Sequence, residues 1–103
     1  MNEKITINKK REKDHHYTEV IFTKNTQHLI KVELAVSSFS EGAKTKFTLW
    51  LNNKEVYSKI LYPILFQRMR YNFTIEDLPC SIKYIWLSGI WYGHIYINGK
   101  AVV

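Results

Sequence analysis

Cysteine is nearly absent from this sequence of 103 residues, which has Cys80 alone. A single cysteine excludes an intramolecular disulfide and a zinc site built from several cysteines of one chain. A protein without disulfides fits a reducing compartment, so we expect a cytoplasmic protein.

Glycine is also scarce, and the four glycines (Gly42, Gly89, Gly93 and Gly99) form neither a GxGxxG pattern nor a P-loop. Both motifs need glycine where the backbone approaches a phosphate group. The sequence therefore gives no indication of nucleotide-dependent catalysis, and we expect no cofactor.

Long hydrophobic runs are missing as well. The longest apolar run covers residues 60–66 and is interrupted by Pro63, whereas a membrane-spanning helix needs about 20 apolar residues. Residues 1–10 lack the apolar segment of a secretory signal. We therefore expect neither a membrane span nor export.

Acidic residues are outnumbered by basic ones, nine against fifteen, which gives a net charge of +6 at pH 7. A positive balance favours association with a polyanion or with an acidic protein surface. The net charge alone does not choose between these two kinds of partner.

Apolar residues are present in ordinary amounts for a folded protein: 46% are hydrophobic, 23% are charged and 15% are aromatic. This length suits one small domain. We expect a single β domain over residues 1–103, in which residues 1–14 are part of the domain or a mobile basic arm.

Alternation of apolar and polar residues recurs along the chain with the period of two that is typical of β-strands. Residues 63–73 also fit a short helix, but their aromatic and β-branched surroundings favour a strand. The strands are expected at residues 4–8, 16–24, 28–38, 46–51, 54–61, 63–73, 81–87, 90–97 and 100–103. Since the segments at residues 4–8 and 63–73 are open to other interpretations, these nine segments predict about seven or eight short strands and an all-β fold, either a single antiparallel β-sandwich or a partly closed small barrel.

Turn residues separate these strands. Asparagine tolerates positive φ, so Asn52 and Asn53 predict a two-residue hairpin turn. The residues expected to oppose one another across it are Leu51 and Lys54, Trp50 and Glu55, and Leu49 and Val56. Asn98 and Gly99 predict a C-terminal hairpin, and residues 76–80 are expected to form a connecting loop because Pro79 removes a backbone donor.

Metal-ligating residues occur without a recognisable spacing. Asp14, His15 and His16 are adjacent, and His28 or His94 would be needed to complete a site. Neighbouring residues of a strand point to opposite faces, so this arrangement does not favour zinc binding. We expect no metal.

The sequence also shows no combination of residues that is typical of a catalytic site. Cys80 has no histidine nearby in the sequence and is expected to be a small, partly buried residue. Glu76 and Asp77 are adjacent, unlike a general acid and base placed across a cleft. We therefore expect a protein that is not an enzyme.

Large amphipathic rings are concentrated near the C-terminus, where residues 84–96 contain five tryptophan or tyrosine residues. The alternatives are packing in the core or an outward patch, and tyrosine and tryptophan are well suited to protein interfaces. The residues that we expect to anchor a partner are Trp86, Trp91, Tyr92 and Tyr96, and those expected to steer it are Arg68, Arg70 and Lys83.

These residues predict a non-catalytic binding protein that engages a protein partner, or its own copy, through an aromatic and basic surface. The alternative is a nucleic-acid-binding β domain that uses Arg68, Arg70, Tyr71 and Tyr84. Carbohydrate recognition at Trp50, Asn52 and Asn53 is a weaker third alternative. Apart from a carbohydrate, no small-molecule ligand is expected.

Overall fold

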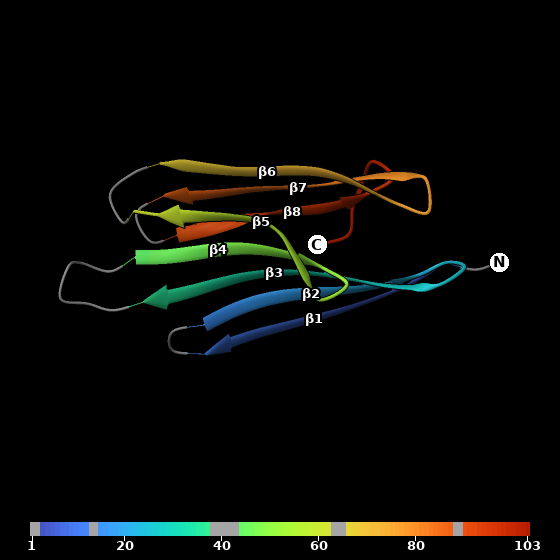
Figure 1. The fold of residues 1–103 in the computed structure, drawn as a ribbon, viewed down its shortest axis with the longest axis horizontal. Helices are drawn as coiled ribbons and strands as arrows, with labels where there is room; N and C mark the ends of the chain where they lie inside the picture. Colours follow the sequence, from blue (N-terminus) through green and yellow to red (C-terminus); the bar gives the residue numbers. More distant parts are fainter. Residues whose placement is uncertain (1–2, 13–14, 38–43, 63–65, 88–89) are drawn as a thin grey trace. The chain divides into compact units, whose positions relative to one another are not determined.

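Nine β-strands make up the regular structure in the computed structural model, which describes residues 3–12, 15–37, 44–62, 66–87 and 90–103 (Figure 1). The strands are β1 (Lys4–Glu12), β2 (His15–Thr23), β3 (Gln27–Ser37), β4 (Lys44–Leu51), β5 (Lys54–Leu61), β6 (Gln67–Ile75), β7 (Leu78–Leu87), β8 (Ile90–Ile97) and β9 (Lys100–Ala101). The predicted all-β class is confirmed. Among the described residues, no helix has the length and hydropathy needed to cross a bilayer.

The strands form two antiparallel sheets, each with the strand order of the chain: β1-β2-β3-β4-β5 and β6-β7-β8-β9. Two separate sheets are the strand inventory of a β-sandwich, not of a closed barrel. The chain divides into two compact units at the same point, residues 1–62 and 63–103.

The core of the first unit follows the predicted alternation. In β3, Ile30, Val32 and Leu34 are buried, whereas Lys31 and Glu33 between them are only partly covered. The neighbouring strands continue these rows with further buried residues, namely Val20, Phe22, Phe47 and Leu49. One face of this sheet is therefore apolar, as its sequence pattern predicts.

The hairpin between β4 and β5 is confirmed in its turn and corrected in part of its register. Asn52 and Asn53 have φ angles of 50° and 66°, and the predicted pairs of Leu51 with Lys54 and of Trp50 with Glu55 are present. Leu49, however, lies opposite Tyr57 and not Val56. The expected third pair is wrong because a β-bulge shifts the register and leaves an extra residue in β5.

The expected loop at residues 76–80 is also wrong. Glu76 and Asp77 alone form the turn, with φ angles of 49° and 67°, and β7 begins at Leu78. Pro79 is tolerated because its carbonyl accepts a hydrogen bond from the Asn98 N–H at 2.8 Å, beside the β8–β9 turn. The N–H and C=O of a strand residue point to the same neighbour, so the missing N–H costs no bond to β6.

The other strand boundaries differ less from those expected. β1 continues through residues 9–12, beyond the expected strand at residues 4–8, and the strand interpretation is confirmed for residues 67–73. The C-terminal hairpin is confirmed, with Asn98 and Gly99 at φ angles of 52° and 80°. Most of the connection between the expected strands at residues 28–38 and 46–51 lies outside the described residues.

Candidate functional site

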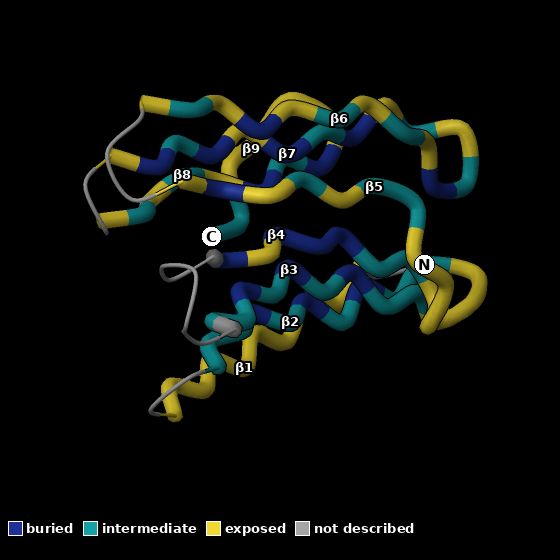
Figure 2. The backbone as a smooth tube through the Cα atoms, turned by 60° about the vertical axis from the view of Figure 1, so that its left-hand side comes forward, coloured by how far each residue is buried: buried dark blue, intermediate teal, exposed yellow. Residues whose placement is uncertain are grey.

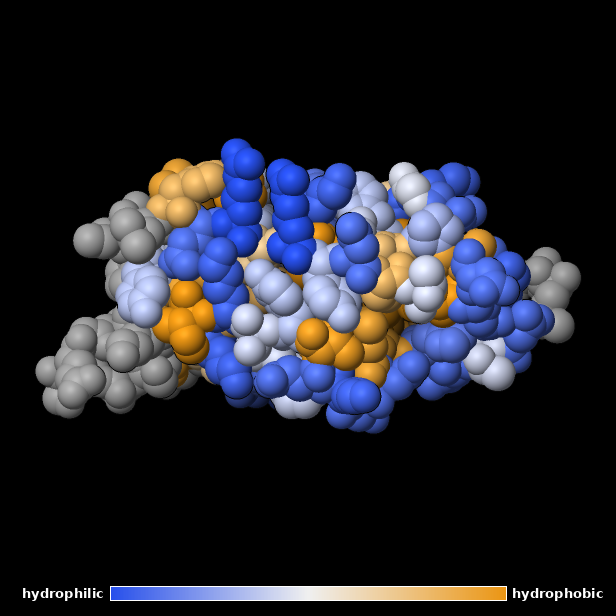
Figure 3. Space-filling view, turned by 45° about the horizontal axis from the view of Figure 1, so that its top comes forward, coloured by the Kyte–Doolittle hydropathy of each residue, from blue (hydrophilic) through white to orange (hydrophobic). Residues whose placement is uncertain are grey.

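The sheet of β6, β7 and β8 has one face that is mostly exposed, and its composition is distinctive. Directly opposed residues of antiparallel strands share a face, so the register assigns the members of this set. We call it the basic face: Arg68, Arg70, Asn72, Thr74, Pro79, Ser81, Lys83, Ile85, Leu87, Ile90, Tyr92, His94 and Tyr96. It contains three permanent cations and no aspartate or glutamate. Figure 3, with the β6 side of Figure 1 turned toward the viewer, shows long hydrophilic side chains standing beside hydrophobic patches.

The seven residues predicted as partner-binding are divided between the two faces of this sheet. The basic face holds five of them: Arg68, Arg70, Lys83, Tyr92 and Tyr96. Trp86 and Trp91 oppose each other on the other face, where Trp86 is buried and Trp91 is half-buried. The predicted aromatic anchors therefore do not form one surface.

Trp91 belongs to a packed aromatic layer on that opposite face. Its ring stacks on Tyr84 with centroids 5.1 Å apart and an interplanar angle of 23°. Burial raises the pKa of the Tyr84 hydroxyl well above its ordinary value. Tyr84 thus remains neutral, and its buried ring is not available to stack on a base.

Gly93 permits this layer to form. It lies directly opposite Tyr84, and a Cβ atom added there would lie 2.2 Å from the Lys83 carbonyl oxygen and 2.7 Å from the Tyr84 Cγ. Such distances are far inside van der Waals contact. Only glycine lets the Tyr84 ring cross the neighbouring strand at this point.

A depression of about 270 Å³ lies on the basic face at the end nearer to the β7–β8 connection. The side chains around it include Phe66, Arg68, Arg70, Lys83 and Tyr92. The Arg68 guanidinium lies 5.4 Å from the centroid of the Phe66 ring, which is a cation–π distance. The depression therefore combines positive charge with exposed rings.

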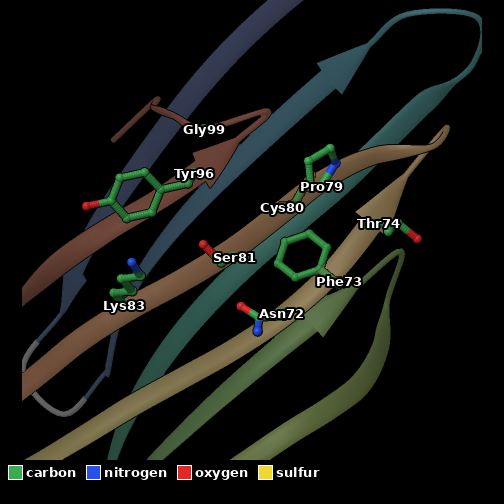
Figure 4. Close-up of a pocket in the computed structure, with 9 residues that line it drawn as sticks. All are labelled: Asn72, Phe73, Thr74, Pro79, Cys80, Ser81, Lys83, Tyr96 and Gly99. Atoms are coloured by element: carbon green, nitrogen blue, oxygen red, sulfur yellow. The ribbon is translucent and has the colours of Figure 1, made fainter.

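A second, more polar depression of about 650 Å³ lies toward the β8–β9 turn (Figure 4). Asn72, Ser81 and Tyr96 line it from three adjacent strands, because they oppose one another in the register. Lys83 lines both depressions, and its ammonium lies 5.4 Å from the centroid of the Tyr96 ring. His94 donates from Nδ1 to the backbone oxygen of Val103 at 2.8 Å.

Cys80 lies beneath this region and is buried. Its thiol donates to the Leu78 carbonyl oxygen at 3.4 Å, and burial raises the pKa of the thiol. A raised pKa lowers the thiolate fraction at neutral pH, which is the opposite of what a nucleophile needs.

A polar cluster that the sequence did not predict lies on the first sheet. Glu33 contacts the His15 ring and accepts a hydrogen bond from Trp50 Nε1 at 3.2 Å, with the Lys31 ammonium 3.9 Å away. Partial burial alone would raise the pKa of Glu33, but the hydrogen bonds from His15 and Trp50 outweigh it, so that this pKa is lowered. The register explains the cluster, because His15 opposes Ala35 and Trp50 opposes Lys31, which makes His15 and Trp50 diagonal neighbours of Glu33 on one face.

Among the described residues, no group of three or more histidine, cysteine, aspartate or glutamate side chains is placed so that it could hold a metal ion. Asp14, the first residue of the expected triplet, lies outside the described residues. His15 and His16 point to opposite faces of β2, as neighbouring strand residues do.

Comparison of the chain with protein-family models, with curated proteins and with solved structures gave no match. The geometry and chemistry of the basic face are therefore what indicate a function.

Proposed function

We propose that this protein is a non-catalytic binding protein whose basic face engages a protein partner rich in carboxylate and apolar side chains. The observation behind the proposal is the combination of three cations with exposed apolar side chains on a face that has no aspartate or glutamate among its described residues. Positive charge would steer an acidic partner, and the apolar groups would supply contact area.

The apolar part of the basic face lies at one end of the sheet. Leu87 opposes Ile90 and Ile85 opposes Tyr92, and Phe66 lines the adjacent depression. Ile90 is 64% exposed and Tyr92 is 57% exposed. Exposed aliphatic side chains of this kind are typical of contacts with another protein, because nucleic acid bases stack on rings and guanidinium groups.

The residues predicted for nucleic-acid binding do not all lie on the basic face. Of the four residues assigned to it, Arg68 and Arg70 lie on the basic face, whereas Tyr71 and Tyr84 lie on the opposite face. Tyr92 and Phe66 supply the exposed rings beside the arginines. Tight binding to single-stranded nucleic acid would therefore contradict the proposal and support this alternative.

A second copy of the chain is a poor match for the basic face. Two such faces would bring Arg68, Arg70 and Lys83 of one copy against the same cations of the other, with no aspartate or glutamate on the face to oppose them. Like charges brought together at an interface cost several kcal/mol. The partner proposed for this face is therefore a different protein.

Selection from a randomised peptide library displayed on phage tests the proposal, with the intact protein as bait. Enriched peptides should combine aspartate or glutamate with large apolar residues. The double variant Arg70→Gln, Lys83→Gln should bind a selected peptide at least about tenfold more weakly in fluorescence anisotropy. Lys54→Gln, which removes an exposed cation outside the basic face, should bind like the wild type.

Two results would contradict the proposal. One is a set of selected peptides without acidic residues, or with equal affinity for the wild type and the double variant. The other is tighter binding to a single-stranded oligonucleotide that weakens steeply with salt, which would support the nucleic-acid alternative.

A further inference from the structure

The edge strand β1 is exposed along its whole length. It pairs with β2 along its whole length and is the first strand of its sheet, so its other edge has no strand partner among the described residues (Figure 1). All nine of its residues are exposed, as the continuous yellow of β1 in Figure 2 shows. Unpaired backbone N–H and C=O groups along such an edge can accept another strand.

One face of this segment continues the buried rows of the first sheet. Ile5 opposes Phe22 and Ile7 opposes Val20, both of which are fully buried. Ile5 and Ile7 themselves remain 41% and 42% exposed. The apolar face of the first sheet thus includes Ile5 and Ile7 of β1, although these two side chains are not buried like their partners in β2.

The order of residues on that face is self-complementary. Glu3, Ile5, Ile7 and Lys9 follow one another at alternate positions, so that an acid and a base flank two isoleucines. Read in the opposite direction, as an antiparallel neighbour presents it, the order is base, isoleucine, isoleucine, acid. Each residue would then face its complement.

We infer that β1 pairs with β1 of a second copy of this chain, antiparallel and centred on Thr6. In this register Ile5 faces Ile7 of the second copy, Glu3 faces Lys9, and Lys4 faces Asn8. The two first sheets become one continuous sheet, joined by roughly six to eight backbone hydrogen bonds. The surface used is distinct from the basic face.

Neighbouring registers that keep the same faces together are less favourable. Centring the pair on Ile7 would set Lys4 against Lys10 and Ile5 against Lys9. Centring it on Asn8 would set each isoleucine against a cation, Ile5 against Arg11 and Ile7 against Lys9. Centring it on Ile5 would set Ile7 against Glu3. Opposed like charges and unmatched isoleucines weaken cross-strand pairs, so the register centred on Thr6, which matches both isoleucines and opposes no like charges, is selected.

Cations usually protect an edge strand from pairing, and β1 has several. In the inferred register Lys10 and Arg11 lie beyond the paired residues 3–9 and do not face their own copies. Lys10 is also paired with Glu12 at 2.8 Å within its own strand. The charged half of β1 therefore limits the pairing to its first half without preventing it.

Charge exchange tests this inference in sedimentation velocity at protein concentrations up to about 1 mM. Glu3→Lys and Lys9→Glu should each raise the dissociation constant of the dimer about three- to tenfold, because each sets like charges against one another twice. The double variant should restore the wild-type value. A monomeric wild type, or a double variant no tighter than the single ones, would overturn the inference.

Cysteine cross-linking tests the register. Residues that oppose one another have Cα atoms about 4.5–5.5 Å apart, within disulfide range, so Thr6→Cys should cross-link to its copy when oxidised glutathione takes up the two electrons. Asn8→Cys, which would be about 13 Å from its copy, is the matched control, and the wild type controls for buried Cys80. Faster cross-linking of Asn8→Cys, or equal rates, would overturn the register.

Discussion

Replacing Gly93 with alanine tests the packing argument for the β6–β9 sheet most directly. The added methyl group would lie 2.2 Å from the Lys83 carbonyl oxygen and 2.6 Å from the Tyr84 Cα. Both are backbone atoms of the neighbouring strand, so no change of rotamer relieves the overlap. The strand pair has to separate locally, or the ladder between β7 and β8 has to break.

The expected cost follows from two opposing contributions. Overpacking costs about 1 to 3 kcal/mol, and contact with backbone atoms favours the upper end of that range. Alanine regains about 0.5 to 1 kcal/mol because glycine is unfavourable within a strand. The net loss in the free energy of unfolding should be about 2 kcal/mol, which lowers Tm by about 8 to 16 °C.

Urea unfolding followed by tryptophan fluorescence measures this loss, because Trp91 stacks on the Tyr84 ring beside the substitution. Gly99→Asn is the matched control: Gly99 has a φ of 80° and open space around it, and asparagine tolerates such a φ. That variant should stay within about 0.5 kcal/mol of the wild type. A Gly93→Ala variant equally close to the wild type would refute the reasoning.

Three other predictions concern separate parts of the chain. Trp86 is buried and Tyr92 is 57% exposed, so Trp86→Ala should cost about 3 to 5 kcal/mol in chemical denaturation and Tyr92→Ala less than about 0.5 kcal/mol; equal costs would contradict the assignment of faces. The pKa of Glu33 is lowered on folding, so its stabilisation is complete above its unfolded-state pKa and is lost as pH falls through its folded pKa. The stability difference between the wild type and Glu33→Gln should therefore shrink in acid, and a difference that does not change with pH would contradict the contact with His15. Cys80 should react with a thiol reagent at least about tenfold more slowly in the native protein than in urea, because burial raises its pKa; equal rates would show an accessible thiol.

The strands could be predicted from the sequence because their alternation is regular and their turns are chemically marked. Asn52 with Asn53 and Asn98 with Gly99 tolerate positive φ, and both hairpins are present. Glu76 and Asp77 also form a turn with positive φ angles, but they are not one of the pairs Asn-Gly, Asp-Gly or Gly-Gly that usually indicate such a turn. Recognising that turn would also have placed Pro79 within a strand.

The candidate site was harder to predict because both faces of the β6–β9 sheet contain large rings. Alternation alone puts Lys83 on one face and Tyr84 and Trp86 on the other, but only the register with β8 shows that Tyr92 lies with Lys83. Composition identified the aromatic excess without assigning it to a face. The bulge that moves Leu49 opposite Tyr57 was hidden for a similar reason, since no residue in β5 marks an extra position.

The strand order of both sheets also bears on how the protein folds. Within each sheet every pair joins two strands that are consecutive in the sequence, so each ladder closes only a short loop and the entropy lost in bringing its strands together is small. Folding rates fall as contacting residues lie further apart along the chain. We therefore expect the hairpins of this protein to form sooner than the long crossovers of a Greek-key protein of equal size, each in turn as its second strand leaves the ribosome.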